Sequence, residues 1–263
     1  METKTRIGSN RTGVQMSPLD AAAMARGEDE FNLMPDVMRL DMQLREDYAG
    51  EADALGSVPL PGSARGLVDS ALDLLAGHRA QVLIDKLGER LAFERGGVRL
   101  YEALLVKCRV AEDSLVPDEV DMLQRFRDQE AEHMDIVASA LRDIGADPTA
   151  QTPCADLVGI ESLGLVQAMN DPRTTLLQSL HVMLDAELLD NAGWDLLIDL
   201  ARAGGHDAMA QAFQTPSMQE AQHLRELRLL VSRLTLKDAT LGSAVGTDQG
   251  GTDDAADGAR LPA

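Results

Sequence analysis

The sequence has few aromatic residues and few cysteines. Phe, Trp and Tyr make up 3% of its 263 residues, and the two cysteines are Cys108 and Cys154. A chain so poor in aromatic residues lacks side chains that strands prefer, whereas Leu, Ala, Met and Arg, which favour helices, are abundant. Two cysteines this far apart form neither a CxxC metal site nor a disulfide framework. The composition therefore favours an all-α protein in a reducing, cytoplasmic environment.

Long apolar runs and positive charge are also scarce. No stretch approaches the roughly 20 apolar residues of a membrane-spanning helix, and the N-terminal segment METKTRIGSNRTGVQ lacks the apolar core of a secretory signal. Lys and Arg number 24 against 44 Asp and Glu, which gives a net charge of −20. This charge repels nucleic acid and anionic lipid but attracts cations. We therefore expect neither nucleic acid nor a membrane as a partner.

Residues that interrupt helices divide the chain into three parts. Residues 1–65 contain short amphipathic pieces at 18–26 and 34–48 among Gly, Pro, Asn and Ser, which predicts a partly ordered arm with a helical extension. Residues 66–236 show helical spacing of apolar side chains and can form a single core. Residues 237–263 are rich in Gly, Asp and Ala, and we expect a disordered acidic tail there.

The lengths of the connections predict how the helices pair. A lead-in helix is expected over 66–77, and four long helices follow, over residues 79–111, 117–145, 173–203 and 206–236. The first and second, and the third and fourth, are joined by short turns and should be antiparallel neighbours. Residues 146–172, with a short helical piece at 157–169, are long enough to cross the height of a bundle. The sequence therefore predicts a four-helix bundle with a long crossover, whose last helix is bent near Thr215.

Two of the five histidines lie in nearly identical pentapeptides, QEAEH at 129–133 and QEAQH at 219–223. In each, a Glu and a His are three residues apart: Glu130 with His133, and Glu220 with His223. Such a pair shares one face of a helix and could bind the same metal ion. One pair alone is equally consistent with a solvated Glu beside a helical His. Their significance depends on the helices that precede them.

Each preceding helix supplies a matching carboxylate. Glu94 and Glu187 lie in apolar stripes of the helices predicted over 79–111 and 173–203, at similar distances from the hairpin turns that follow. The chain thus contains two copies of one unit, with Glu on its first helix and ExxH on its second. Four carboxylates and two imidazoles in a bundle interior would be costly as bare charges. Two divalent cations would offset that cost.

The predicted ligands therefore divide by role. We expect Glu130 and Glu220 to bridge the two ions, Glu94 and Glu187 to be terminal ligands, and His133 and His223 to bind one ion each. Carboxylate and imidazole ligands without thiolate favour iron or manganese.

The set Glu94, Glu130–His133, Glu187 and Glu220–His223 resembles the ferritin-like di-iron carboxylate superfamily, which includes bacterioferritin, rubrerythrin, manganese catalase and the ribonucleotide reductase small subunit. The resemblance covers about residues 79–236. It implies a ferritin-like four-helix bundle, in which two iron ions, or manganese, activate dioxygen or peroxide and oxidise iron or a small substrate with an unidentified electron donor. Such a protein would be an oxidoreductase and could form a homo-oligomer. The alternatives are non-catalytic iron sequestration and manganese catalase-like peroxide dismutation.

Tyr101 also matches the superfamily. It lies two helical turns after Glu94 on the same face, where ferritins, bacterioferritins and rubrerythrins commonly place a tyrosine as a hydrogen-bond donor or electron source. We consider it a candidate catalytic residue, with core packing as the alternative. Gly96 and Gly97 follow Glu94 inside the same helix, either for close packing or as an opening for dioxygen or a substrate.

The chain departs from the superfamily at other positions. It has no CxxC pair for a rubredoxin-like electron-transfer module. Bacterioferritin-like sites often have an Asp that supports each ligand His, but Gln129 and Gln219 precede the bridging glutamates here. The candidates to support the imidazoles instead are Asp185, Asp190 and Asn191.

Overall fold

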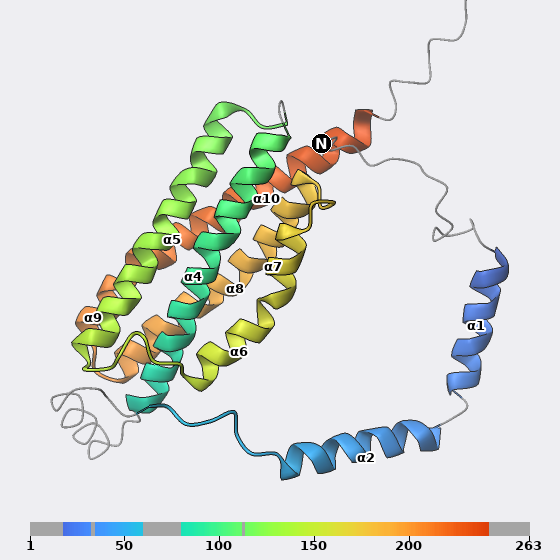
Figure 1. Cartoon of the computed structure of the whole chain (residues 1–263), viewed down its shortest axis with the longest axis horizontal. Helices are drawn as coiled ribbons and strands as arrows, with labels where there is room; N and C mark the ends of the chain where they lie inside the picture. The colour runs from blue at the N-terminus through green and yellow to red at the C-terminus, as the bar shows by residue number, and fades with distance from the viewer. Residues whose placement is uncertain (1–17, 33–34, 60–79, 112–113, 242–263) are drawn as a thin grey trace, which may run out of the picture. The chain divides into compact units, whose positions relative to one another are not determined.

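The computed structural model describes residues 18–32, 35–59, 80–111 and 114–241 (Figure 1). Within these ranges α-helix is the only regular secondary structure, so the all-α prediction is confirmed for them. None of the helices in these ranges is both long enough and apolar enough to cross a membrane. The lead-in helix predicted over 66–77 and the end of the chain after 241 lie outside the described residues.

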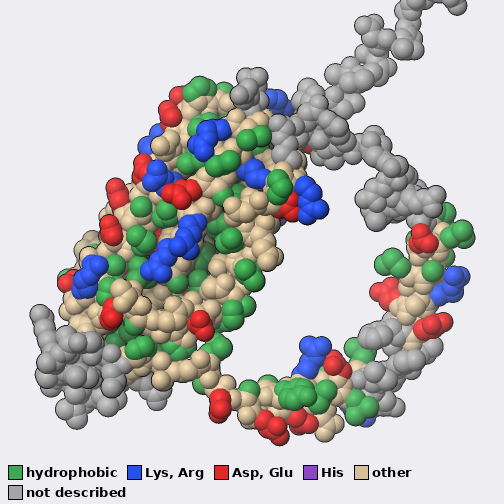
Figure 2. Space-filling model, in the orientation of Figure 1, with side chains coloured by type: hydrophobic (Ala, Val, Ile, Leu, Met, Phe, Trp, Pro, Cys, Tyr) green, Lys and Arg blue, Asp and Glu red, His purple; other side chains and the backbone are tan. Residues whose placement is uncertain are grey.

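Two helices precede the long ones. They are α1, Pro18–Asn32, and α2, Pro35–Glu51. Each begins at a proline, which the first turn of a helix tolerates because the N–H there has no intrahelical acceptor. Apolar side chains on both helices are exposed, among them Leu19, Leu40 and Tyr48 (Figure 2). The structure therefore shows longer helices than the amphipathic pieces predicted at 18–26 and 34–48.

Helices α4, Ala80–Val110, and α5, Pro117–Asp143, match the first two long helices predicted from the sequence. Pro117 occupies the first position of α5, and the carboxylate of Glu119 accepts a hydrogen bond of 3.0 Å from the N–H of Val116. This bond satisfies one of the donors that a helix start leaves without a partner. Gly145 follows α5 with φ of 77°, a left-handed conformation that favours glycine after a helix.

The crossover contains two short helices, α6, Pro153–Glu161, and α7, Leu163–Asn170, in place of the single piece predicted there. Helix α8, Leu176–Ala203, then begins with a capping box. The Thr175 side chain accepts from the N–H of Gln178, and the Gln178 side chain accepts from the N–H of Thr175. Gly205, with φ of 76°, turns the chain after α8.

The last predicted helix is divided into α9, Asp207–Ala212, and α10, Gln214–Leu241. The division lies just before Pro216, which has no N–H to donate and therefore fits the first turn of a new helix. The bend expected near Thr215 is thus a break at Phe213. Helix α10 also ends at Leu241 and not near residue 236.

The chain forms two compact units. Among the described residues, unit 1 contains α4 from Glu94 onward, α5 as far as Ile136, and everything from Ser162. Within unit 1, α8 packs against α7 and α10, and α4, α5, α8 and α10 contribute side chains to one buried cluster. The largest fully buried apolar side chains of this unit are Tyr101, Leu104, Leu123, Phe126, Met169, Leu180, Met183, Trp194, Leu197 and Phe213.

Polar contacts near the helix ends also join the elements of unit 1. The Lys107 ammonium on α4 donates to the backbone carbonyls of Asp171 and Thr174, at 2.6 and 3.0 Å, just before α8 begins. Arg233 on α10 pairs with Glu119 on α5 at 2.6 Å. These contacts join α4 to the start of α8 and α10 to α5.

Unit 2 includes α1, α2, α4 through Phe93, and residues 137–161. Here the start of α6 packs closely on α4. A Cβ added to Gly88 would lie 2.5 Å from Thr152 Oγ1, so only glycine allows this approach. The Asp85 carboxylate accepts a hydrogen bond of 2.9 Å from the N–H of Cys154.

Candidate metal centre

Six acidic and histidine side chains meet in the interior of unit 1. Each is at most 1% exposed: Glu94, Glu130, His133, Glu187, Glu220 and His223. Their ligand atoms form two groups, in each of which all atoms lie within 4.8 Å of one another: Glu94, Glu130, His133 and Glu220 in the first, and Glu130, Glu187, Glu220 and His223 in the second. Glu130 and Glu220 belong to both groups. The structure therefore brings together all six residues predicted as ligands.

Helix periodicity explains this convergence. On α5, Glu130 and His133 are three residues apart and share the buried face, and Glu220 and His223 repeat the arrangement on α10. Glu94 on α4 and Glu187 on α8 each lie among apolar residues that are buried on the same side of the helix. Burial of these four apolar faces in one core carries the carboxylates and imidazoles inward with them.

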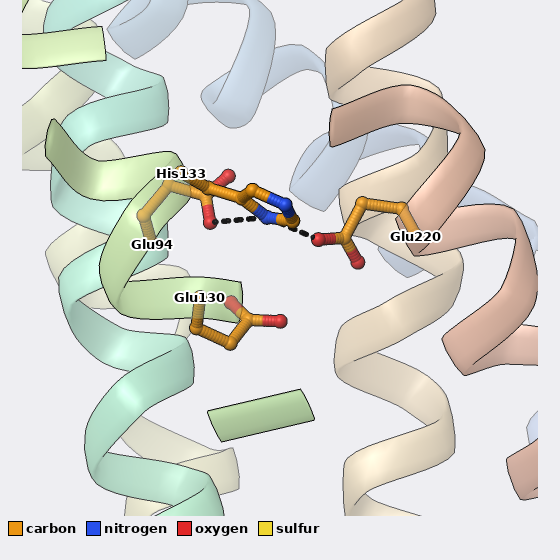
Figure 3. Close-up of side chains that lie close together, drawn as sticks. All are labelled: Glu94, Glu130, His133 and Glu220. Atoms are coloured by element: carbon orange, nitrogen blue, oxygen red, sulfur yellow. Dashed lines mark ion pairs between the residues drawn. The ribbon is translucent and has the colours of Figure 1, made fainter. Parts of the chain in front are cut away.

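His133 lies between two carboxylates of the first group (Figure 3). Its Nδ1 is 2.7 Å from Glu220 Oε1 and 3.7 Å from Glu94 Oε2. The Glu130 carboxylate from the next turn of α5 is directed toward the same space (Figure 3). The first group thus joins one side chain of α4, two of α5 and one of α10.

His223 has the corresponding position in the second group. Its Nδ1 lies 3.2 Å from Glu220 Oε2, 3.5 Å from Glu130 Oε1 and 3.6 Å from Glu187 Oε1. Both imidazoles therefore direct the same ring atom, Nδ1, toward the carboxylates. The planes of the two rings are nearly parallel, at 23°, and their centroids are 6.2 Å apart.

The other nitrogen of each ring is held by a glutamine. His133 Nε2 is 2.8 Å from Gln219 Oε1, and His223 Nε2 is 2.8 Å from Gln129 Oε1. An amide oxygen only accepts hydrogen bonds, so each Nε2 must carry the hydrogen. In a neutral ring that arrangement leaves a lone pair on Nδ1, which is the form that binds a metal ion.

These donor atoms fit metal ions. Both oxygens of Glu130 and of Glu220, and Nδ1 of both histidines, are buried and face one another, at distances as short as 2.7 Å, with no other hydrogen-bond partner among the described residues. Buried polar atoms are normally hydrogen-bonded, because leaving them unpaired costs about 1–3 kcal/mol each. A lone pair on Nδ1 that faces a carboxylate oxygen at 2.7 Å requires a positive charge nearby, from protons or from metal ions. Carboxylate oxygen and imidazole nitrogen are ligands that iron and manganese accept.

Without metal, protons accumulate on the histidines. Burial disfavours the imidazolium form, but the carboxylates of Glu220 and Glu94 raise the pKa of His133 to about 10. Burial likewise opposes the charge on His223, whose pKa is raised to about 12 by Glu130, Glu187 and Glu220. Both rings therefore carry a proton that a bound cation would displace.

The pKa values of the carboxylates shift in different directions. Burial and the charge of Glu220 hold the pKa of Glu130 well above its usual range, despite the opposing contact with His223. Burial also raises the pKa of Glu187 to about 8. Burial disfavours the charge on Glu220 too, but its contacts with His133 and His223 outweigh this and hold its pKa well below the usual range. Glu220 is therefore the carboxylate that both imidazoles stabilise.

Two aromatic residues border the cluster. Tyr101 is fully buried, and its hydroxyl donates a hydrogen bond to Glu187 Oε1. Burial and the nearby charge of Glu187 hold the pKa of Tyr101 well above its usual range, so the phenol keeps its proton. The indole of Trp194 meets His133 edge-on, with 5.7 Å between ring centroids. Sequence reasoning did not identify Trp194, although it follows Glu187 by seven residues as Tyr101 follows Glu94.

The two adjacent glycines of α4 have different surroundings. A Cβ on Gly97 would lie 2.2 Å from Glu130 Oε2, whereas a Cβ on Gly96 would meet nothing within 4 Å. Gly97 therefore provides the space for the carboxylate shared by both groups. This supports the packing interpretation of Gly97 and gives it a specific partner.

The residues expected to support the imidazoles have other contacts. Asp185 is half-exposed and lies 3.8 Å from His181 Nε2. Asn191 Nδ2 donates to the backbone carbonyls of Glu187 and Glu220, at 2.9 and 3.1 Å. Asp190 is buried on α8. Gln129 and Gln219 themselves contact the outer nitrogens of the rings.

Comparison with protein-family models, with curated proteins and with solved structures found no match to this chain. The class of the protein therefore follows from its own geometry. In the residues that the structure describes, its regular secondary structure is all helical, and a buried carboxylate and imidazole cluster could hold metal.

Proposed function

We propose that this chain is a ferritin-like dinuclear metal protein that binds two iron ions and uses them to activate dioxygen or peroxide. Its activity would be that of an oxidoreductase that oxidises iron itself or a small substrate. The observation that supports this most strongly is the overlap of the two ligand groups, which share Glu130 and Glu220 and differ in the other Glu and the His. A site for a single ion needs no such duplication.

The charges of the cluster also favour two cations. When all four buried carboxylates are ionised, two protonated imidazoles offset only half of their negative charge, and in the metal-free cluster protons on Glu130 and Glu187 lower the rest. Two divalent ions offset all four and leave both imidazoles neutral, which removes the cost of burying a net charge.

The order of the helices supports the ferritin-like assignment. A short connection joins α4 to α5, and α8 is joined to α10 through the short helix α9, whereas α6 and α7 lie between α5 and α8. Ferritin-like bundles have this connectivity, and they carry one Glu on each of two helices and an ExxH pair on each of the other two. The proposed fold and the proposed ligands are therefore consistent with each other.

Each residue then has a defined task. Glu130 and Glu220 would bridge the ions, Glu94 and Glu187 would each hold one, and His133 and His223 would bind through Nδ1. Two ferrous ions held by these residues would supply the two electrons that, with two protons, reduce one dioxygen to hydrogen peroxide. Tyr101 would orient Glu187 through its hydroxyl, and the surrounding core would exclude bulk water from the reacting atoms.

Anaerobic loading with ferrous iron, followed by addition of oxygen, tests the proposal. We expect about two irons per chain and rapid oxygen consumption with a transient visible absorption band. Uptake of many irons would favour sequestration, and protein that is isolated with manganese and evolves oxygen from peroxide would favour dismutation. A chain that binds neither iron nor manganese stoichiometrically would contradict the proposal.

A further inference from the structure

The pentapeptides QEAEH and QEAQH share a glutamine at their first position that the ligand assignment leaves unexplained. In each motif the Gln lies four residues before the His, on the same side of the helix. Yet Gln129 on α5 contacts His223 on α10, and Gln219 on α10 contacts His133 on α5, both at 2.8 Å. The contacts are therefore reciprocal, and each motif holds the imidazole of the other.

We propose that Gln129 and Gln219 are crossed positioning residues whose neutral amides set the redox preference of the metal pair in favour of the divalent state. The inference deepens the proposed function and rests on it. Each amide oxygen accepts the Nε2 hydrogen of the opposite ring, so Nδ1 is the atom available to the metal ion.

The argument for the divalent state comes from charge. With neutral rings and neutral amides, four carboxylates and two divalent ions sum to zero in a buried site. A carboxylate in place of either amide would add a negative charge and make the ring it contacts a stronger electron donor. Both effects would favour the trivalent ions. An amide at both positions therefore keeps the site neutral when the metals are reduced.

The crossing also links the two ions. The position of His133 depends on α10 through Gln219, and the position of His223 depends on α5 through Gln129. A change in Gln219 should therefore affect the ion bound by Glu94 and His133, although Gln219 belongs to the motif of His223. A side chain that acted only on its own helix would show the opposite pattern.

The test uses Gln129→Glu and Gln219→Glu, which keep the side-chain shape and change an amide to a carboxylate. Gln222→Glu is the matched control. It adds the same charge to the second motif at an exposed position, and it makes that motif identical to QEAEH, in which Glu132 is also exposed. We expect a redox titration of iron-loaded protein to show, for either test variant, a ratio of oxidised to reduced iron at a fixed potential that is at least about tenfold higher than in the wild type. For a one-electron step this is a decrease of about 59 mV in the reduction potential. A shift no larger than that of Gln222→Glu would overturn the proposal.

A second measurement does not depend on iron. In wild-type protein loaded with zinc, nitrogen NMR should show both His133 and His223 with Nδ1 bound to metal and hydrogen on Nε2. Gln219→Glu should then shift the Nε2 signal of His133 and leave that of His223, and Gln129→Glu should do the reverse. If each variant instead shifted the Nε2 signal of the histidine on its own helix, the crossed contacts would be overturned, although the proposed metal site would not. Failure to bind either zinc or iron would overturn the proposed function as well.

Discussion

The cluster is built from two halves that have the same ligands and different neighbours. One half is α4 with α5, and the other is α8 with α10. Each provides a Glu on its first helix and QExxH on its second. At the position seven residues after the first Glu, however, one half has Tyr101 and the other has Trp194.

The aromatic residues make the halves unequal. Tyr101 donates a hydrogen bond to Glu187 in the opposite half, whereas the indole N–H of Trp194 is buried without a hydrogen-bond partner among the described residues. Each ring also packs edge-on against an aromatic residue of its own half, Phe126 or Phe213. The two halves have the same candidate ligands but different aromatic neighbours. We therefore expect that two ions bound there would be inequivalent.

The largest effect should come from the residues that both groups share. Glu130→Gln and Glu220→Gln remove the negative charge and one donor oxygen of a carboxylate that both groups share, and they should reduce iron binding from about two ions per chain to nearly none. Glu94→Gln and Glu187→Gln should each weaken mainly one ion and leave the other. Elemental analysis after anaerobic loading measures the difference. Glu132→Gln, which changes an exposed residue of the first motif, is the control and should keep both ions. Equal losses from all four ligand variants would contradict the division into shared and separate ligands.

The two halves also differ three residues after the first Glu of each, where one has Gly97 and the other has Asp190. A substitution at Gly97 should have the next largest effect on metal binding. Gly97→Ala places a Cβ 2.2 Å from Glu130 Oε2, so the carboxylate must turn away. We expect metal affinity to fall by about 10- to 100-fold, as for other residues that orient ligands. Calorimetric titration with a divalent ion measures this.

Gly96→Ala is the matched control for Gly97→Ala, because its Cβ meets nothing within 4 Å. It should leave metal affinity unchanged and raise the free energy of unfolding by about 1 kcal/mol, since alanine is the better helix former. If both alanine variants bind metal as the wild type does, Gly97 is not needed to accommodate the carboxylate.

The sequence was sufficient to predict that these six acidic and histidine side chains meet in the interior. Helical spacing sets Glu130 with His133 and Glu220 with His223 on one face each, and the repeat indicates which Glu of α4 and of α8 lies at the same depth. These relations are local or depend only on chain length. Tertiary packing could not change them without reversing an amphipathic helix.

The contacts beyond the ligands could not be predicted in the same way. Whether Gln219 reaches the ring of its own helix or that of α5 depends on the distance and angle between the two helices, which no spacing within one helix determines. The same uncertainty led us to consider Asp185 and Asn191, whose side chains point elsewhere. Trp194 was the exception, because its offset from Glu187 equals that of Tyr101 from Glu94 and the repeat already contained the signal.

Protons should compete with metal ions for the buried carboxylates and imidazoles of both halves. In the metal-free protein the pKa of Glu187 is about 8 and that of His133 about 10, so both groups hold protons at neutral pH. A metal ion must displace them, and its apparent affinity falls as the pH falls. We expect a change of about tenfold per pH unit for each proton released, between about pH 6 and pH 8. Calorimetry in buffers of different ionisation enthalpy counts the protons, and an affinity independent of pH would contradict the protonated resting state.

The smallest expected effect comes from the aromatic residue of each half. Tyr101→Phe removes the hydroxyl that donates to Glu187, a hydrogen bond worth about 0.5–1.5 kcal/mol. Because Glu187 belongs only to the group of His223, the variant should weaken one ion severalfold and leave the other, as titration with cobalt and its visible absorption would show. Trp194→Phe removes an N–H that has no hydrogen-bond partner in the described part of the chain, so its cost should come from the lost ring volume and appear in the free energy of unfolding. Equal weakening of both ions by Tyr101→Phe would mean that the two halves act as one unit despite their different neighbours.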